Sequence, residues 1–101
     1  MDQVVRRATP TDISALDELE AEARHAVLST RGGQRWCEVV PARTGRWLGG
    51  DTVVFLAVWE HVPVGYLVLR CGEVAKVESV WVTPGAREVG FGDWLLEAAL
   101  N

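Results

Sequence analysis

Residues 74–100 read VAKVESVWVTPGAREVGFGDWLLEAAL, and this stretch decides the fold. Residues 74–82 are rich in β-branched side chains, and alternate positions of an extended chain point to opposite faces, so a strand is predicted here. The alternation assigns one face to Val74, Lys76, Glu78, Val80 and Val82, and the other to Ala75, Val77, Ser79 and Trp81. Pro84 and Gly85 then end the strand, because proline cannot donate to a ladder and glycine permits the backbone to reverse.

A helix is predicted soon after this turn. Gly90 and Gly92 open it, and apolar side chains then recur at helical spacing at Trp94, Leu95, Ala98 and Ala99. The connecting loop is expected to bring unpaired backbone N–H groups and the positive end of a helix dipole to one point. Such a point holds a phosphate group without basic side chains, so the sequence predicts an anion site.

The spacing of the glycines narrows the kind of anion site. Gly85 and Gly90 have the separation found in a P-loop, but Phe91, Gly92 and Asp93 stand where that motif needs Lys and Ser or Thr. The three-glycine Rossmann pattern is also absent, since only Gly90 and Gly92 have the required separation. A nucleoside triphosphatase is therefore disfavoured.

The pattern V-x-P-x-x-R-x-x-G-x-G is present at Val82, Pro84, Arg87, Gly90 and Gly92. It resembles motif A of the GNAT superfamily, the acetyl-coenzyme A-dependent N-acyltransferases. The strand before it, the helix after it, and the pair Leu95 and Leu96 inside that helix agree with the resemblance.

The whole chain has the size and composition of one compact domain. It has 101 residues, of which 49% are hydrophobic, and a mean hydropathy of +0.09. One ordinary core is therefore expected over residues 1–101, as all or part of a single domain. A net charge of −4 and a pI near 5.1 disfavour nucleic acid and anionic membranes as main partners, because both require a dominant basic face.

The cysteines and the first residues indicate the compartment. Cys37 and Cys71 lack a paired C-x-x-C spacing, so we expect two reduced thiols and neither a disulfide nor a metal site. No apolar run reaches membrane-spanning length, and residues 1–3 lead directly into a structured pattern without an export signal. A cytoplasmic protein is predicted.

The chain begins with a predicted strand over residues 4–8 and a helix start at Thr9, with Pro10 in the first turn and Asp12 completing a capping box. An apolar stripe follows at Ile13, Leu16, Leu19, Ala23 and Val27. The solvent side is expected to carry Asp17, Glu18, Glu20, Glu22 and Arg24. This pattern predicts a helix that packs one face on a sheet.

Residues 31–50 lack clear periodicity and are locally positive. Against the single acid Glu38, they carry four arginines and two tryptophans, at Arg31, Arg35, Arg43, Arg46, Trp36 and Trp47. One interpretation is contact with a nucleic acid or a phosphorylated ligand. The other, which we favour, is a short helix and loop anchored by the tryptophans, with solvated arginines. In GNAT proteins this region often helps to line the acceptor pocket, so contact with substrate is a further expectation.

Residues 52–59 are apolar almost throughout, as expected for a strand covered on both faces. A turn leads to a second strand over residues 64–69, where Tyr66 is expected to be a core or cleft aromatic whose hydroxyl reaches a polar rim. The order strand, helix, short helix, three strands and helix is that of the first part of the GNAT fold. The resemblance thus implies an α/β (α+β) class with a GNAT-like mixed sheet.

The resemblance also implies how acetyl-coenzyme A binds. Its pantetheine arm is expected to face Val80, Trp81 and Val82. Its pyrophosphate is expected to be wrapped by the backbone N–H groups of Arg87, Glu88, Val89, Gly90, Phe91, Gly92 and Asp93. Glu88 stands where the family often has glycine or a basic residue, and its charge opposes a pyrophosphate unless it points to solvent.

The resemblance covers about the first two thirds of the usual GNAT domain. The strand, helix and closing strands that follow motif A lie beyond these 101 residues, so a truncated domain is predicted. An apolar strand edge would then stay open, which favours a homodimer or a complementing fragment.

The reaction that the resemblance implies is direct attack of a primary amine on the thioester of acetyl-coenzyme A. The amine must first lose a proton, for which a carboxylate at the cleft, or a water that it holds, serves as general base. Glu78 is the candidate, because alternation places it on the strand face of Val80 and Val82. The alternative is a solvent-facing Glu78 paired with Lys76 or Arg70.

We therefore predict an N-acetyltransferase that uses acetyl-coenzyme A and an amine acceptor which the sequence does not identify. The competing hypothesis is a catalytically inactive half-domain that binds coenzyme A or a partner chain. A nucleic-acid binder built on the arginines and tryptophans is the weakest of the three, because the chain is acidic.

Overall fold

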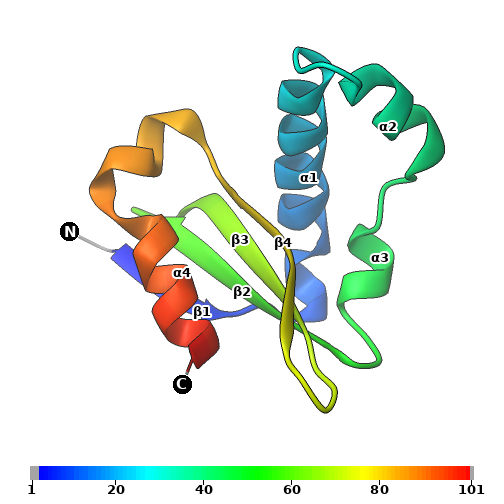
Figure 1. The fold of residues 1–101 in the computed structure, drawn as a ribbon. Helices are drawn as coiled ribbons and strands as arrows, with labels where there is room; N and C mark the ends of the chain where they lie inside the picture. The colour runs from blue at the N-terminus through cyan, green and yellow to red at the C-terminus, as the bar shows by residue number, and fades with distance from the viewer. Residues whose placement is uncertain (1–2, 101) are drawn as a thin grey trace.

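A computed structural model describes residues 3–100 and arranges them as helices on both sides of one sheet (Figure 1). In chain order the elements are β1 (Gln3–Arg7), η1 (Pro10–Asp12), α1 (Ile13–Leu28), α2 (Gly33–Val39), α3 (Thr44–Trp47), β2 (Thr52–Trp59), β3 (Val62–Arg70), β4 (Lys76–Val82), η2 (Pro84–Val89) and α4 (Phe91–Leu100). The predicted order is confirmed, except that residues 31–50 form two short helices instead of one. None of the helices within residues 3–100 is long and apolar enough to cross a membrane.

The four strands form one sheet in the order β1-β2-β3-β4, and each neighbouring pair is antiparallel. The mixed sheet that was predicted is thus purely antiparallel within residues 3–100. Glu60 and His61 join β2 to β3 with φ values of 50° and 69°, and positive φ at both positions matches the twist of a two-residue hairpin. Strands β2 and β3 occupy the centre of the sheet, which explains why residues 52–59 are apolar throughout.

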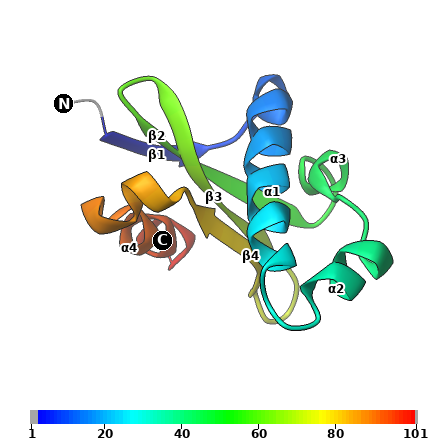
Figure 2. The same ribbon diagram turned by 90° about the horizontal axis from the view of Figure 1, so that it is seen from above.

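Each face of the sheet carries its own hydrophobic core. The view from above shows α1 on one side of the sheet and α4 on the other (Figure 2). The core beneath α1 and α3 contains Leu16, Leu19, Trp47, Val54, Leu56, Tyr66 and Val68. The core beneath α4 contains Ala57, Val64, Leu67, Val82, Ala86, Phe91 and Leu95. Motif A therefore packs on the face opposite to α1, and β4 lies between the two helices at the edge of the sheet.

Helix α1 is entered through the predicted capping residues. The backbone N–H of Thr9 donates to the Asp12 carboxylate at 2.8 Å, and Asp12 also forms an ion pair with Arg6 at 2.8 Å. The hydrogen bonds from Arg6, followed by that from Thr9, lower the pKa of Asp12 to about 2. This pairing ties the end of β1 to the start of α1.

Glu20 corrects the predicted faces of α1, because its side chain is buried and not solvated. Its carboxylate accepts the backbone N–H groups of Arg43 and Thr44, with N–O distances of 2.9 to 3.1 Å, and the Thr44 hydroxyl at 2.7 Å. The Nε of Arg43 lies 3.7 Å from the same carboxylate. Glu20 thus caps α3 and fixes the segment between α2 and α3 against α1.

Arg24 also departs from the predicted solvent face. Its Nη2 donates to the backbone carbonyls of Cys37 and Val40 at the end of α2. The favoured interpretation of residues 31–50 holds for Trp47, which is buried, but not for Arg43, which is half-buried and lies over the rings of Trp36 and Trp47. Both arginines therefore have a structural role.

Gly65 sets how closely β3 and β4 approach. A Cβ atom at this position would lie 2.7 Å from the carbonyl oxygen of Trp81, which is closer than real Cβ atoms come. It would also be tight against Val82, at 3.1 Å from Cγ2 and 3.2 Å from Cα. The V-G-Y sequence of β3 is thus explained by contact with the strand that precedes motif A.

We expect Gly65→Ala to lower the free energy of unfolding by roughly 1–3 kcal/mol, because the added methyl group forces β3 and β4 apart. Urea denaturation monitored by circular dichroism measures this change. Gly45→Ala is the matched control, since a Cβ there meets nothing within 4 Å. Equal stability of the two variants would contradict the close approach.

We expect Glu20→Ala to lower the free energy of unfolding by about 2–4 kcal/mol, because it leaves buried N–H groups and the Arg43 guanidinium without their carboxylate. Glu18→Ala on the same helix is the control, since Glu18 is exposed and its loss should change stability by no more than about 0.5 kcal/mol. The same denaturation experiment separates the two. A small effect for both would show that Glu20 does not hold the segment.

Candidate active site

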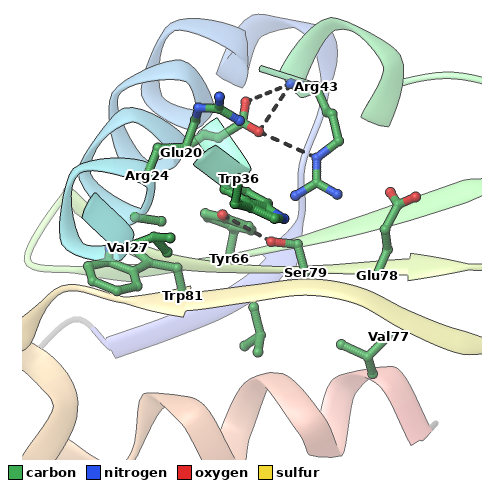
Figure 3. Close-up of a pocket in the computed structure, with 12 residues that line it drawn as sticks. Glu20, Arg24, Val27, Trp36, Arg43, Tyr66, Val77, Glu78, Ser79 and Trp81 are labelled. Carbon is green, nitrogen blue, oxygen red and sulfur yellow. Dashed lines mark hydrogen bonds and ion pairs between the residues drawn. The ribbon is translucent and has the colours of Figure 1, made fainter. Parts of the chain in front are cut away.

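A bulge in β4 changes which side chains face α1. Ser79 pairs with Val68 and Val77 with Leu69, which leaves Glu78 as an extra residue in β4. The side chains of Glu78, Ser79 and Trp81 consequently point to the α1 side of the strand, and Val77 points to the α4 side (Figure 3). The prediction that Glu78 shares a face with Val80 and Val82 through simple alternation is therefore wrong.

A cavity of about 390 Å³ lies between this side of β4 and the helices α1 and α2 (Figure 3). It is lined by Glu20, Ala23, Arg24, Val27, Trp36, Arg43, Tyr66, Val77, Glu78, Ser79, Val80 and Trp81. The volume falls in the range of small-molecule sites. Residues 31–50 thus contribute two of the walls, Trp36 and Arg43, to a cavity whose floor is formed by β3 and β4.

Tyr66 and Ser79 form a polar patch on that floor. The Tyr66 ring is 1% exposed and lies 5.1 Å from the centroid of Trp47, while its hydroxyl is 3.2 Å from the Ser79 hydroxyl. Burial raises the pKa of Tyr66, so the phenol stays protonated and can donate a hydrogen bond. The expected cleft position of Tyr66 is confirmed.

Glu78 lies at the end of the cavity nearest to Arg43 (Figure 3). Its carboxylate is paired with Arg70 of β3, which agrees with the alternative interpretation of Glu78, yet the side chain is only 18% exposed and lines the cavity. The hydrogen bond from Arg70 lowers the pKa of Glu78, and the positive charges of Arg70 and Arg43 add to this. Glu78 is therefore a carboxylate that stays ionised at neutral pH.

The outer edge of β4 is unpaired within residues 3–100. The N–H of Thr83 donates to Val64 of β3. The Val82 carbonyl belongs to the same trans peptide and points the opposite way, so it faces outward. The Arg87 side chain folds onto this edge, with its Nε 2.9 Å from the Val82 oxygen and its guanidinium carbon 4.6 Å from the Trp81 ring centroid. Trp81 thus connects the cavity on one side to motif A on the other.

The open loop predicted between strand and helix is wrong in part, because residues 84–89 form the 3₁₀-helix η2. In a 3₁₀-helix the N–H groups turn back to carbonyls three residues earlier, as the Ala86 N–H does to Thr83 at 2.9 Å. The backbone N–H groups of Arg87, Glu88 and Val89 are thereby directed along η2. These three N–H groups therefore do not face outward as the prediction required.

The predicted anion site depends on backbone N–H groups that have no partner inside a helix, and the start of α4 has such groups. Gly90 adopts a left-handed conformation with φ of 101°, and the first helical bond of α4 runs from the N–H of Trp94 to Gly90. The N–H groups of Phe91, Gly92 and Asp93 precede that bond and have no partner inside the helix. A Cβ at Gly92 would meet nothing within 4 Å, so a ligand can approach the backbone there. The Phe91 ring is buried and anchors this terminus in the core.

The residues predicted to face a pantetheine arm separate into different environments. Trp81 lines the cavity, Val80 is 50% exposed at the open edge, and Val82 is 8% exposed and packs in the core beneath α4. Glu88 is exposed, so its carboxylate is free to point away from an anion at α4. No group of three or more potential metal-ligating side chains comes together in residues 3–100.

Sequence reasoning missed the charged residues of the cavity that come from α1. Glu20 lies four residues after Leu16 and three before Ala23, and this spacing belongs to the buried stripe. The spacing was therefore a usable signal for Glu20, although charge suggested exposure. No sequence signal distinguished Trp36 and Arg43 from the other tryptophans and arginines of residues 31–50.

No protein-family model matches the chain, and no curated protein matches it in sequence. Solved structures match its fold. A ribosomal-protein-alanine N-acetyltransferase from Brucella melitensis biovar Abortus 2308 has a TM-score of 0.76 at 13% identity, and the match covers 99% of this chain and 71% of that chain. The PaiA N-acetyltransferase from Thermoplasma acidophilum, in complex with coenzyme A, has a TM-score of 0.72 at 16% identity and coverages of 98% and 70%.

An aminoglycoside acetyltransferase from an uncultured soil metagenomic sample, in complex with trehalose, is similar in the same way. Its TM-score is 0.70 at 19% identity, with 96% of this chain and 66% of that chain covered. These identities are low, so the matches show the fold and leave the activity open. The chain has the acetyltransferase fold of the GNAT family, as motif A predicted.

Proposed function

We propose that this protein transfers an acetyl group from acetyl-coenzyme A to a primary amine, in the cytoplasm. One juxtaposition carries the proposal: Arg87 of motif A contacts the Trp81 ring at the open edge of β4, and Trp81 also lines the cavity that holds the ionised carboxylate of Glu78. A coenzyme along the strand edge would thus meet an amine held in the cavity. The coenzyme A complex of the similar Thermoplasma protein supports the choice of donor.

The coenzyme site follows from the geometry of motif A. The pyrophosphate would accept hydrogen bonds from the N–H groups of Phe91, Gly92 and Asp93, aided by the dipole of α4. Gly90 turns the backbone into that helix, and the arm would run past Val80 along the edge of β4. Arg87, Glu88 and Val89 of η2 then flank the site without supplying amides.

Arg87 covers a backbone acceptor that the coenzyme would need. Its Nε occupies the Val82 carbonyl, which is the acceptor that an amide of the pantetheine arm would use. Binding therefore releases the Arg87 side chain, which is exposed and can turn to the pyrophosphate. Trp81 loses its cation contact at the same time.

Chemistry at the cavity would proceed by direct transfer. An acceptor ammonium gives one proton to the Glu78 carboxylate, directly or through a water, and becomes a nucleophilic amine. The amine nitrogen attacks the thioester carbonyl carbon, the C–N bond forms, and the C–S bond breaks to leave the thiolate of coenzyme A. The second proton lost by the nitrogen neutralises that thiolate. The bulge at Glu78 directs this carboxylate into the cavity (Figure 3).

A second candidate function is a non-catalytic module that binds a partner through β4. Val77 and Val80 are 47% and 50% exposed beside the unpaired edge, and such an edge can accept a strand from another chain. Sedimentation of the protein with and without acetyl-coenzyme A tests this candidate. A stable dimer that binds no coenzyme would favour it.

Gly92→Asp should weaken binding of acetyl-coenzyme A by about tenfold relative to Gly92→Asn, because the two side chains have one shape and only the first brings a negative charge to the pyrophosphate. Isothermal titration calorimetry with acetyl-coenzyme A measures both. The fold should persist in each, since a Cβ at this position meets no atom within 4 Å. Absence of binding by the unaltered protein at millimolar concentration would remove the transferase proposal.

Glu78→Gln should lower kcat by about a hundredfold while the affinity for acetyl-coenzyme A stays the same, because the amide cannot accept the proton. Steady-state kinetics and calorimetry with acetyl-coenzyme A measure the two quantities.

In Arg70→Gln the pKa of Glu78 should rise towards its ordinary value, because the carboxylate loses its hydrogen bond from Arg70. The ionised form is then lost at a higher pH, and the acid limb of the pH–rate profile moves to higher pH. Arg35→Gln is the control, since Arg35 is exposed on α2 and lines no part of the cavity. An unchanged profile in Arg70→Gln would exclude Glu78 as the proton acceptor.

A further inference from the structure

The charged side chains around the cavity are only partly committed to partners among residues 3–100. Two carboxylates, Glu20 and Glu78, and two guanidinium groups, Arg24 and Arg43, line it. The Glu20 carboxylate is saturated by Arg43 and by the start of α3, and Arg24 donates through Nη2 to two backbone carbonyls at the end of α2. Arg24 Nη1 and Arg43 Nε are buried and have no hydrogen-bond partner within residues 3–100, so the unused donors of the cavity belong to cations. Glu78 remains as the carboxylate that can accept a further donor from a ligand, because Arg70 engages its Oε1.

The part of the cavity remote from Glu78 is apolar and aromatic. Val27 and Trp81 lie there, on the other side of Tyr66 and Ser79 from Glu78, and the Trp36 ring is drawn above Tyr66 and Ser79 (Figure 3). The guanidinium carbon of Arg24 lies 5.1 Å from the Trp36 ring centroid, which holds this ring over the cavity. Ligand surface placed here would lie against aromatic rings and aliphatic groups. The Glu22 carboxylate is close by, where it accepts the indole N–H of Trp81 at 2.9 Å, but it does not line the cavity.

We infer that the acceptor is a small primary monoamine with an apolar or aromatic body. Its ammonium group lies at Glu78 and Ser79, and its body lies between Trp36, Trp81 and Val27. This inference deepens the proposed function, on which it rests, by naming the substrate class of the same cavity. The arrangement supplies one anionic contact for one cation, and aromatic surface for the remainder.

A polycationic amine fits this cavity poorly. Additional ammonium groups would lie against the apolar end or close to Arg24 and Arg43, where no unpaired carboxylate of the cavity compensates them. Bringing a cation into such surroundings costs its hydration and adds like-charge repulsion. The cavity thus discriminates by charge as well as by shape.

Binding of amines can be followed without catalysis through the indole N–H signals of the tryptophans in two-dimensional NMR. The probe is 2-phenylethylamine, with ethylamine and 2-phenylethanol as controls that lack the ring or the amine. We expect saturable shifts of the Trp36 and Trp81 signals with 2-phenylethylamine, and affinities at least about fivefold lower for each control. Trp36→Phe assigns the Trp36 signal.

Two variants test the parts of the cavity separately. Trp36→Ala should weaken 2-phenylethylamine about five- to tenfold, and Trp36→Phe should restore most of this, because the phenyl ring keeps the aromatic surface. Trp36 is 37% exposed, so its truncation should leave the fold intact. Val27→Glu places a carboxylate at the apolar end and should raise the affinity for 1,6-diaminohexane about fivefold over the unaltered protein.

Acetylation is then compared by mass spectrometry with equal concentrations of 2-phenylethylamine and the polycation kanamycin. Preferential acetylation or tighter binding of kanamycin would overturn the inference, and so would the absence of any shift at Trp36 and Trp81 with 2-phenylethylamine. Shifts at both tryptophans without binding of acetyl-coenzyme A would support the amine site while refuting the transferase. The two failures are therefore distinguishable.

Discussion

A buried carboxylate on α1 determines the shape of the candidate site. Glu20 is 2% exposed and accepts the backbone N–H groups of Arg43 and Thr44. These bonds fix the segment between α2 and β2 at the start of α3. Arg24 adds hydrogen bonds to the carbonyls of Cys37 and Val40, and the buried Trp47 anchors α3 in the core. The wall formed by Trp36 and Arg43 thus depends on two charged side chains of α1, Glu20 and Arg24, that a charge-based view of the helix places in water.

The edge of the sheet supplies the second half of the site. Strand β4 pairs with β3 on one side only, and its bulge turns Glu78 towards α1 while the outward carbonyl of Val82 remains at the open edge. A single strand therefore presents a carboxylate to a cavity and a backbone acceptor to a neighbouring ligand. Close packing at Gly65 keeps β4 near β3, since a larger residue would meet the Trp81 carbonyl.

Motif A combines a core function with an exposed helix terminus. Ala86, Phe91 and Leu95 pack beneath the sheet and fix η2 and α4, and this leaves the first N–H groups of α4 directed outward. Arg87 then links the motif to β4 through the Val82 carbonyl and the Trp81 ring. Trp81 lies between motif A and the proposed acceptor cavity, because it contacts Arg87 and also lines the cavity.

The sequence by itself determined the order of the elements, the central position of residues 52–59 and the helix start at Gly90, because periodicity, glycine and proline act locally. It also predicted Tyr66 as a core or cleft aromatic with its hydroxyl at a polar rim, and the structure places this residue in both, since it is buried and lines the cavity. Only the tertiary structure decided the direction of Glu78, since a bulge depends on how β3 and β4 pair and alternation within one strand does not reveal it. The burial of Glu20, the wall at Trp36 and the η2 turn at Arg87 likewise arise from contacts between segments far apart in the chain.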